Sequence, residues 1–116
     1  MLGAIDVLED FLHPLGAQTI VPGHGPVGGP ETIDDVLAYL RFVRDLARDG
    51  DAVGATPLDL ARETDLGAFA DCTDTERIVG NLHRAFQDLT VQRRIAVYLS
   101  TSPPYKTWSP TTAGSR

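Results

Sequence analysis

Apolar residues recur along most of the chain at steps of three and four, the repeat of a helix with one buried face. The first run predicts a helix over about residues 2–15, which Gly16 ends. A second run predicts a helix over about 31–49, with Pro30 suited to its first turn and Gly50 to its end. The apolar positions are Leu2, Ile5, Leu8, Phe11, Leu12 and Leu15, then Ile33, Val36, Leu37, Leu40, Val43, Leu46 and Ala47.

Two more helices are predicted in the second half of the chain. The pair Thr56-Pro57 is typical of an N-cap followed by a first helical position, and it begins a short helix over 57–66. Thr73 and Glu76 have the spacing of a capping box at the start of a helix over 74–89. The apolar positions of this last helix are Ile78, Val79, Leu82, Ala85, Phe86 and Leu89.

Beyond Leu89 the pattern weakens. The polar stretch 92–94 precedes Ile95–Leu99, which fits either a strand or the end of a helix. Residues 101–116 are rich in Ser, Thr, Pro and Gly and poor in apolar side chains, so we expect a disordered tail.

One short stretch has the composition of a strand. Thr19, Ile20 and Val21 are β-branched, which predicts a buried strand over 18–21 that ends at Pro22. A lone strand cannot satisfy its own backbone hydrogen bonds. The pattern therefore predicts that the chain is the end of a larger fold or pairs with another chain across this strand.

Composition narrows the class of protein and its partners. A length of 116 residues with 42% apolar and 22% charged residues fits one soluble domain, and a net charge of -6 argues against nucleic acid as a partner. The first apolar stretch contains Asp6, Glu9 and Asp10 and lacks a basic start, so we expect neither a signal peptide nor a membrane span. A single cysteine, Cys72, excludes an internal disulfide and favours a cytoplasmic location.

The loop over 22–29 contains the candidate chemistry. Its stretch Pro22-Gly23-His24-Gly25-Pro26 places a histidine between glycines, which allow close approach of a partner, and prolines, which stiffen the backbone. A neutral imidazole is the commonest protein ligand of zinc. The alternative is a turn in which the histidine only caps backbone groups.

Ile20–Val27, preceded by a helix and a short strand and followed by a long helix, resembles the closing segment of the metallo-β-lactamase superfamily. The resemblance covers about residues 3 to 89 and is most similar to a bacterial branch that includes zinc-dependent cyclases of aromatic polyketides. The resemblance implies an α/β fold. The chain would then be a fragment of a larger αββα domain. The stretches that carry the similarity to this branch are Tyr39–Val43, Gly54–Pro57, Asp65–Gly67 and Glu76–Phe86.

The resemblance also implies a metal role for His24, as the last histidine ligand of a site that holds one or two zinc ions. The main metal motif of the superfamily, His-x-His-x-Asp-His, occurs nowhere in the chain. The chain would therefore supply His24 to a hydrolase and be inactive, or nearly so, by itself. The other ligands would come from an upstream N-terminal half.

No other residue is expected to complete this site. His13 lies near the end of the first predicted helix, where a capping or exposed role is expected, and His83 lies on the flank of an apolar face, where a packing or hydrogen-bonding role is expected. Cys72 has no second cysteine beside it, so we interpret it as a structural or surface thiol.

Glu76, Arg77 and Asn81 form a polar group at the start of the helix predicted over 74–89. We expect Glu76 to act in the capping box, and Arg77 and Asn81 to bridge to a neighbouring loop. A second hypothesis is a small acidic helical interaction module without catalysis, in which the glycine-rich loop is structural. Either an upstream N-terminal half or a homo-oligomer would cover the exposed strand edge.

Overall fold

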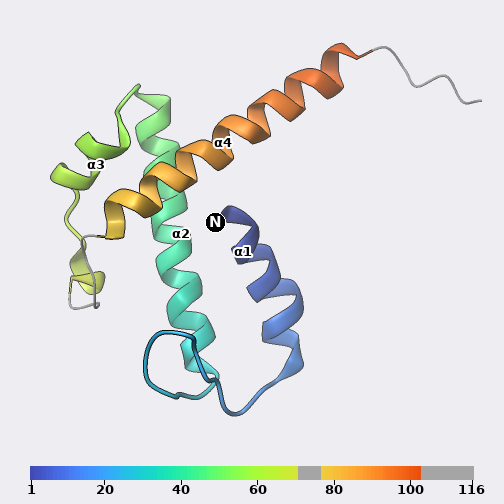
Figure 1. Ribbon diagram of the computed structural model, residues 1–116, viewed down its shortest axis with the longest axis vertical. Coiled ribbons are helices and arrows are strands. Elements are labelled where there is room, and N and C mark those ends of the chain that lie inside the picture. Colours follow the sequence, from blue (N-terminus) through green and yellow to red (C-terminus); the bar gives the residue numbers. More distant parts are fainter. Residues whose placement is uncertain (71–76, 103–116) are drawn as a thin grey trace, which may run out of the picture.

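The computed structural model describes residues 1–70 and 77–102, and most of them are helical (Figure 1). In this part of the chain the long helix α2 (Glu31–Ala52) is central and α4 (Ile78–Thr101) crosses it. The helices α1 (Leu2–Val7) and α3 (Pro57–Glu63) lie on opposite sides of α2 in this view. Short turns of other helix types are π-helical η1 (Leu8–Leu12) and the 3-10 helices η2 (His13–Leu15) and η3 (Gly67–Phe69).

The expectation of an α/β fold, as a fragment of an αββα arrangement, is wrong, because the described residues contain helices and no sheet. The strand predicted over 18–21 is reduced to one antiparallel bridge between Ile20 and Gly28. Strands form only where a second stretch accepts their backbone hydrogen bonds. Here the one partner found among the described residues comes from the same loop, and Thr19 and Val21 stay exposed.

The helices differ from their predicted ranges mainly at their ends. The stretch 2–15 is helical throughout, but it passes from α1 through η1 to η2 before Gly16, with φ of 63°, ends it. The second helix does not end at Gly50 but continues to Ala52. The helix α4 runs through the ambiguous stretch 95–99 as far as Thr101.

The core consists of two clusters that follow one face of α2. Near the start of α2, Ile33 and Leu37 pack against Ile5 of α1, with Ile20 partly buried beside them. Further along α2, a larger cluster joins α2 to α4 through Val43, Ala47, Ile78, Leu82 and Ala85. Because one continuous helix supplies both clusters, α2 fixes the positions of the other helices.

The helix α3 and the turn η3 cover the second cluster from one side. Thr56 accepts a hydrogen bond of 3.2 Å from the N–H of Asp59, which confirms the predicted N-cap. The ring of Phe69 in η3 lies 5.5 Å from that of Tyr39 and 5.1 Å from that of Phe42, measured between centroids. These ring contacts hold the segment after α3 against α2.

Polar contacts join helices that are distant in sequence. The Asp88 carboxylate of α4 accepts hydrogen bonds from the Met1 amino group, at 2.8 Å, and from the N–H of Leu2, at 3.0 Å. The hydrogen bond from Met1 is the main cause that lowers the pKa of Asp88. The amide of Asn81 donates a hydrogen bond of 2.7 Å to the hydroxyl of Tyr39 on α2.

The second half of α4 leaves the core altogether. Every residue from Thr90 to Thr101 is exposed, and Figure 1 shows this part of the helix projecting past the start of α1. In the described residues, no helix is both long and apolar enough to cross a membrane.

Candidate functional site: the loop of His24

The loop that contains His24 is closed at its base by two backbone hydrogen bonds. Ile20 N–H donates to the carbonyl of Gly28 at 2.8 Å, and Gly28 N–H donates back to the carbonyl of Ile20 at 3.0 Å. Ile20 also packs against the first core cluster, formed by Ile5, Ile33 and Leu37. The base of the loop is therefore held to the helices, while residues 21–27 extend from it.

Gly28 and Gly29 lie where the loop joins α2, and a side chain at either position would meet neighbouring atoms. A Cβ at Gly28 would lie 2.4 Å from Oγ1 of Thr32, and a Cβ at Gly29 would lie 2.4 Å from Oε2 of Glu31. Gly29 N–H donates to Oε1 of Glu31 at 2.8 Å. The pKa of Glu31 is lowered, first by its own backbone N–H and then by that of Gly29. The loop thus enters α2 through a tight turn that larger residues would disturb.

His24 lies at the exposed end of this loop. Gly23, Gly25 and Pro26 beside it are also exposed, and Gly25 takes a φ of 125°, which favours glycine. Within residues 1–70 and 77–102, His24 has no side-chain hydrogen bond or ion pair, so the role of capping backbone groups is not seen there. The imidazole is free to meet a ligand that approaches from outside the chain.

The described residues do not bring further metal ligands to His24. Among them, no group of three or more His, Cys, Asp or Glu side chains is close enough together to hold a metal ion. A catalytic zinc takes about three protein ligands and an open position for water. The described residues by themselves therefore do not form a complete set of zinc ligands.

The other two histidines lie elsewhere on the surface. His13, at the start of η2, approaches Asp34 of α2 with 3.5 Å between Nε2 and Oδ1, and both side chains are exposed. His83 is exposed on α4, although its sequence position predicted a packing role. It lies away from the face that Leu82 and Ala85 bury, because adjacent helical residues are rotated by about 100°.

The polar group at the start of α4 is only partly described. Asn81 bonds to Tyr39 on α2, so it bridges to a helix and not to a loop as predicted. Arg77 is exposed at the residue before α4. Cys72, Glu76 and the predicted capping box at Thr73 lie outside the described residues, and so does the stretch 103–116 of the predicted tail.

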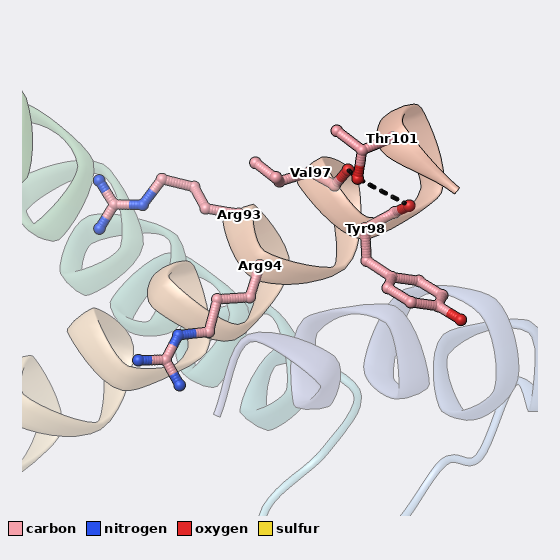
Figure 2. A pocket seen from close by; sticks show the side chains of 5 residues that line it. All are labelled: Arg93, Arg94, Val97, Tyr98 and Thr101. Atoms are coloured by element: carbon pink, nitrogen blue, oxygen red, sulfur yellow. Dashed lines mark hydrogen bonds between the residues drawn. The ribbon is translucent and has the colours of Figure 1, made fainter. Parts of the chain in front are cut away.

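In the part of the chain that the structure describes, two shallow hollows lie along α4. The first is lined by residues of α4 alone, and Figure 2 shows Arg94 and Tyr98 extending to one side of the helix while Arg93 and Val97 extend to the other. The second lies between the start of α3 and the middle of α4. Its lining residues are Pro57, His83, Phe86, Gln87, Thr90, Val91 and Arg94.

The exposed apolar surface of the second half of α4 was not predicted from the sequence. The spacing of apolar residues could have revealed this surface. Leu82 and Val91 are nine residues apart, or about two and a half helical turns. They therefore point to opposite sides of the same helix. Leu82 is fully buried and Val91 is exposed.

Comparisons with known proteins found no matching family model, no matching curated protein and no matching solved structure.

Proposed function

We propose that the chain supplies His24 as one ligand of a zinc site whose remaining ligands belong to another polypeptide segment. The observation that carries this proposal is the imidazole of His24, which is exposed and has no partner among residues 1–70 and 77–102, on a loop that the Ile20–Gly28 bridge ties to the helices. The sequence around His24 resembles the last metal-ligand segment of the metallo-β-lactamase superfamily, which also supports it.

The proposed chemistry follows from the metal. Zinc lowers the pKa of a bound water to near neutral and polarises the carbonyl that this water attacks. His24 would bind the metal, and the loop would orient the ring. In the branch that includes aromatic polyketide cyclases, such a site acts on a β-keto substrate, and this is the substrate class that we propose for the complete assembly.

The amount of zinc bound per chain tests this proposal directly. Equilibrium dialysis followed by metal analysis is carried out on the full chain, with and without a separately expressed segment of a related protein that contains the His-x-His-x-Asp-His motif. We expect the added segment to raise the amount of zinc bound per chain. With His24→Ala, this rise should be smaller. The matched control is His83→Ala, which removes an exposed histidine from α4 and should leave zinc binding unchanged.

Two results would contradict the proposal. One is zinc binding to the mixture that His24→Ala does not weaken. The other is a folded chain that binds no zinc in either condition.

A second candidate function is an acidic helical interaction module without catalysis. The observation that favours it is the second half of α4, where Val91, Ile95, Tyr98 and Leu99 are exposed. Exposed apolar side chains that cluster on one surface are typical of protein interaction sites. A chain that folds without zinc and binds a partner through α4 would support this function.

A further inference from the structure

The second half of α4 is an amphipathic helix whose apolar side is largely exposed in the described residues. Val91, Ile95, Tyr98 and Leu99 follow one another at steps of four, three and one, which places them within about 100° on the helix. Their exposed fractions are 54%, 53%, 70% and 70%. We name these four residues the α4 stripe.

A second apolar surface is exposed on the N-terminal helical segment. Val7, Phe11 and Leu15 are spaced by four residues, and their exposed fractions are 48%, 68% and 74%. Leu2 and Ile5, which come before them in the same segment, are buried. We name these three exposed residues the N-terminal face.

The charges that border these two surfaces are of opposite sign. Arg94 precedes Ile95 in the stripe, and Asp6 and Asp10 precede Val7 and Phe11 of the N-terminal face. Within the described residues none of the three charged side chains forms an ion pair, whereas the neighbouring Arg93 pairs with Asp51 at 2.9 Å. A stripe bordered by a free cation therefore complements a face bordered by free anions.

The α4 stripe lies on the side of α4 that faces the start of the N-terminal segment. The side of α4 that reaches Met1 through Asp88 continues along the helix as the stripe. Figure 1 shows this half of α4 projecting past the start of α1. A second copy placed there can therefore offer its N-terminal face to the stripe and receive the same contact in return.

We propose that the chain forms a two-fold dimer in which the α4 stripe of each copy packs on the N-terminal face of the other. Such a reciprocal arrangement is the commonest symmetry of homo-oligomers and buries both apolar surfaces in each copy. The inference names the partner for the interaction module and is independent of zinc binding by His24. A monomer whose His24 binds zinc would overturn the dimer alone.

A second copy fits the charge pattern better than a membrane does. An amphipathic helix that binds anionic lipid is rich in Lys and Arg on its polar side. Here Arg93 and Arg94 are the only charged residues from Thr90 to Thr101, Arg93 is already paired, and the chain has a net charge of -6. The whole molecule would be repelled by an anionic surface.

Sedimentation velocity of the full 116-residue chain over a range of concentrations tests the apolar contact. We expect a monomer–dimer equilibrium whose dissociation constant rises at least about tenfold for Ile95→Asp. The matched control is Val97→Asp, at an exposed position on the other side of the same helix, and it should leave the equilibrium unchanged. Circular dichroism of both variants verifies that α4 remains helical.

Charge reversal tests which surface covers the stripe. Arg94→Glu should weaken the dimer about tenfold, and the double variant Asp6→Arg, Asp10→Arg should do the same, because each places like charges across the contact. The triple variant Asp6→Arg, Asp10→Arg, Arg94→Glu should restore dimerisation, since it exchanges the signs. Arg48→Glu, at an exposed position on α2, is the control for charge alone.

Three results would overturn the proposal. The first is a monomer at every concentration. The second is a dimer that Ile95→Asp does not weaken, or whose charge reversals do not compensate each other. The third is a monomer that binds phosphatidylglycerol vesicles through Ile95, which would make the stripe a membrane-binding surface.

Discussion

The Cβ position of Gly50 on α2 would lie 2.2 Å from Cδ1 of Leu60 on α3. Gly50 is buried inside a helix, where glycine is otherwise unfavourable by about 1 kcal/mol relative to alanine. The missing side chain allows Leu60 to approach the backbone of α2. The close packing of α3 on α2 thus offsets the poor helix propensity of the glycine.

Gly50→Ala and Gly80→Ala should change stability in opposite directions. At Gly50 the added methyl group overpacks against Leu60, which we expect to outweigh the gain in helix propensity and to cost about 1 kcal/mol net. At Gly80 no atom lies within 4 Å of the added Cβ, so alanine should stabilise α4 by about 0.5–1 kcal/mol. Urea unfolding at one protein concentration measures both, and the same sign for the two variants would contradict this account.

Asp88→Asn should destabilise the protein in a pH-dependent way. The folded-state pKa of Asp88 is lowered, chiefly by the hydrogen bond from Met1, so its carboxylate stabilises the fold above the unfolded-state pKa of about 4. That stability is lost as the pH falls through the lowered folded-state pKa. We expect a loss of about 1–2 kcal/mol at pH 6 that shrinks as the pH falls below the unfolded-state pKa. Asp49→Asn, at an exposed position, should show no such change, and a constant difference across this range would contradict the prediction.

The hydrogen bond between Asn81 and Tyr39 should contribute about 1 kcal/mol to the free energy of unfolding. A double-mutant cycle with Asn81→Ala and Tyr39→Phe isolates this contribution, because the two groups contact each other directly. The coupling energy should be positive. Purely additive effects would show that the bond does not stabilise the packing of α2 on α4.

Leu82→Ala and Val91→Ala should differ in their effect on the free energy of unfolding, because the two residues lie on opposite sides of α4. Leu82 is fully buried in the second core cluster, so its truncation should cost about 2–5 kcal/mol. Val91 is exposed, so its truncation should change the unfolding free energy of the monomer by no more than about 0.5 kcal/mol. These measurements are made at concentrations below the dissociation constant of any dimer. A large loss for Val91→Ala would mean that it packs within its own chain.

His24→Ala should leave stability within about 0.5 kcal/mol of the parent chain, because the side chain is exposed and unpaired in the described residues. Gly28→Ala should destabilise the base of the same loop, since its Cβ would lie 2.4 Å from Oγ1 of Thr32. Gly23→Ala, with no neighbouring atom within 4 Å, is the matched control. Thermal unfolding compares the three variants, and a large loss for His24→Ala would indicate a structural histidine.

The strand shows where sequence reasoning fails. Thr19, Ile20 and Val21 have strand composition, but a strand is a property of two stretches together, and the second is not determined by the first. In the described residues Ile20 pairs only with Gly28, so the predicted sheet is absent. The α/β expectation depended on that sheet and failed with it.

His24 shows the same difference between what neighbouring residues determine and what tertiary contacts determine. Glycines and prolines around it predicted an exposed loop able to present an imidazole, because those residue types act locally on the backbone. Which groups surround the ring is a matter of tertiary contact. The structure places His13 beside Asp34 and His83 on α4, and forms no three-ligand group in the part that it describes.

The sequence by itself determined the local features: the helical periodicity of 2–15 and 31–49, the N-cap at Thr56 and the glycine turn after Leu15. These depend on neighbours within about one helical turn, and the side chains involved are adjacent in sequence. Tertiary structure alone decided which apolar faces meet. Leu82 packs in one cluster with Val43 and Ala47 of α2. Val91 and Ile95 are of similar hydrophobicity and lie on the same helix, but they are exposed. Hydrophobic burial is non-directional, so the pattern predicts which residues favour burial but not which surface covers them.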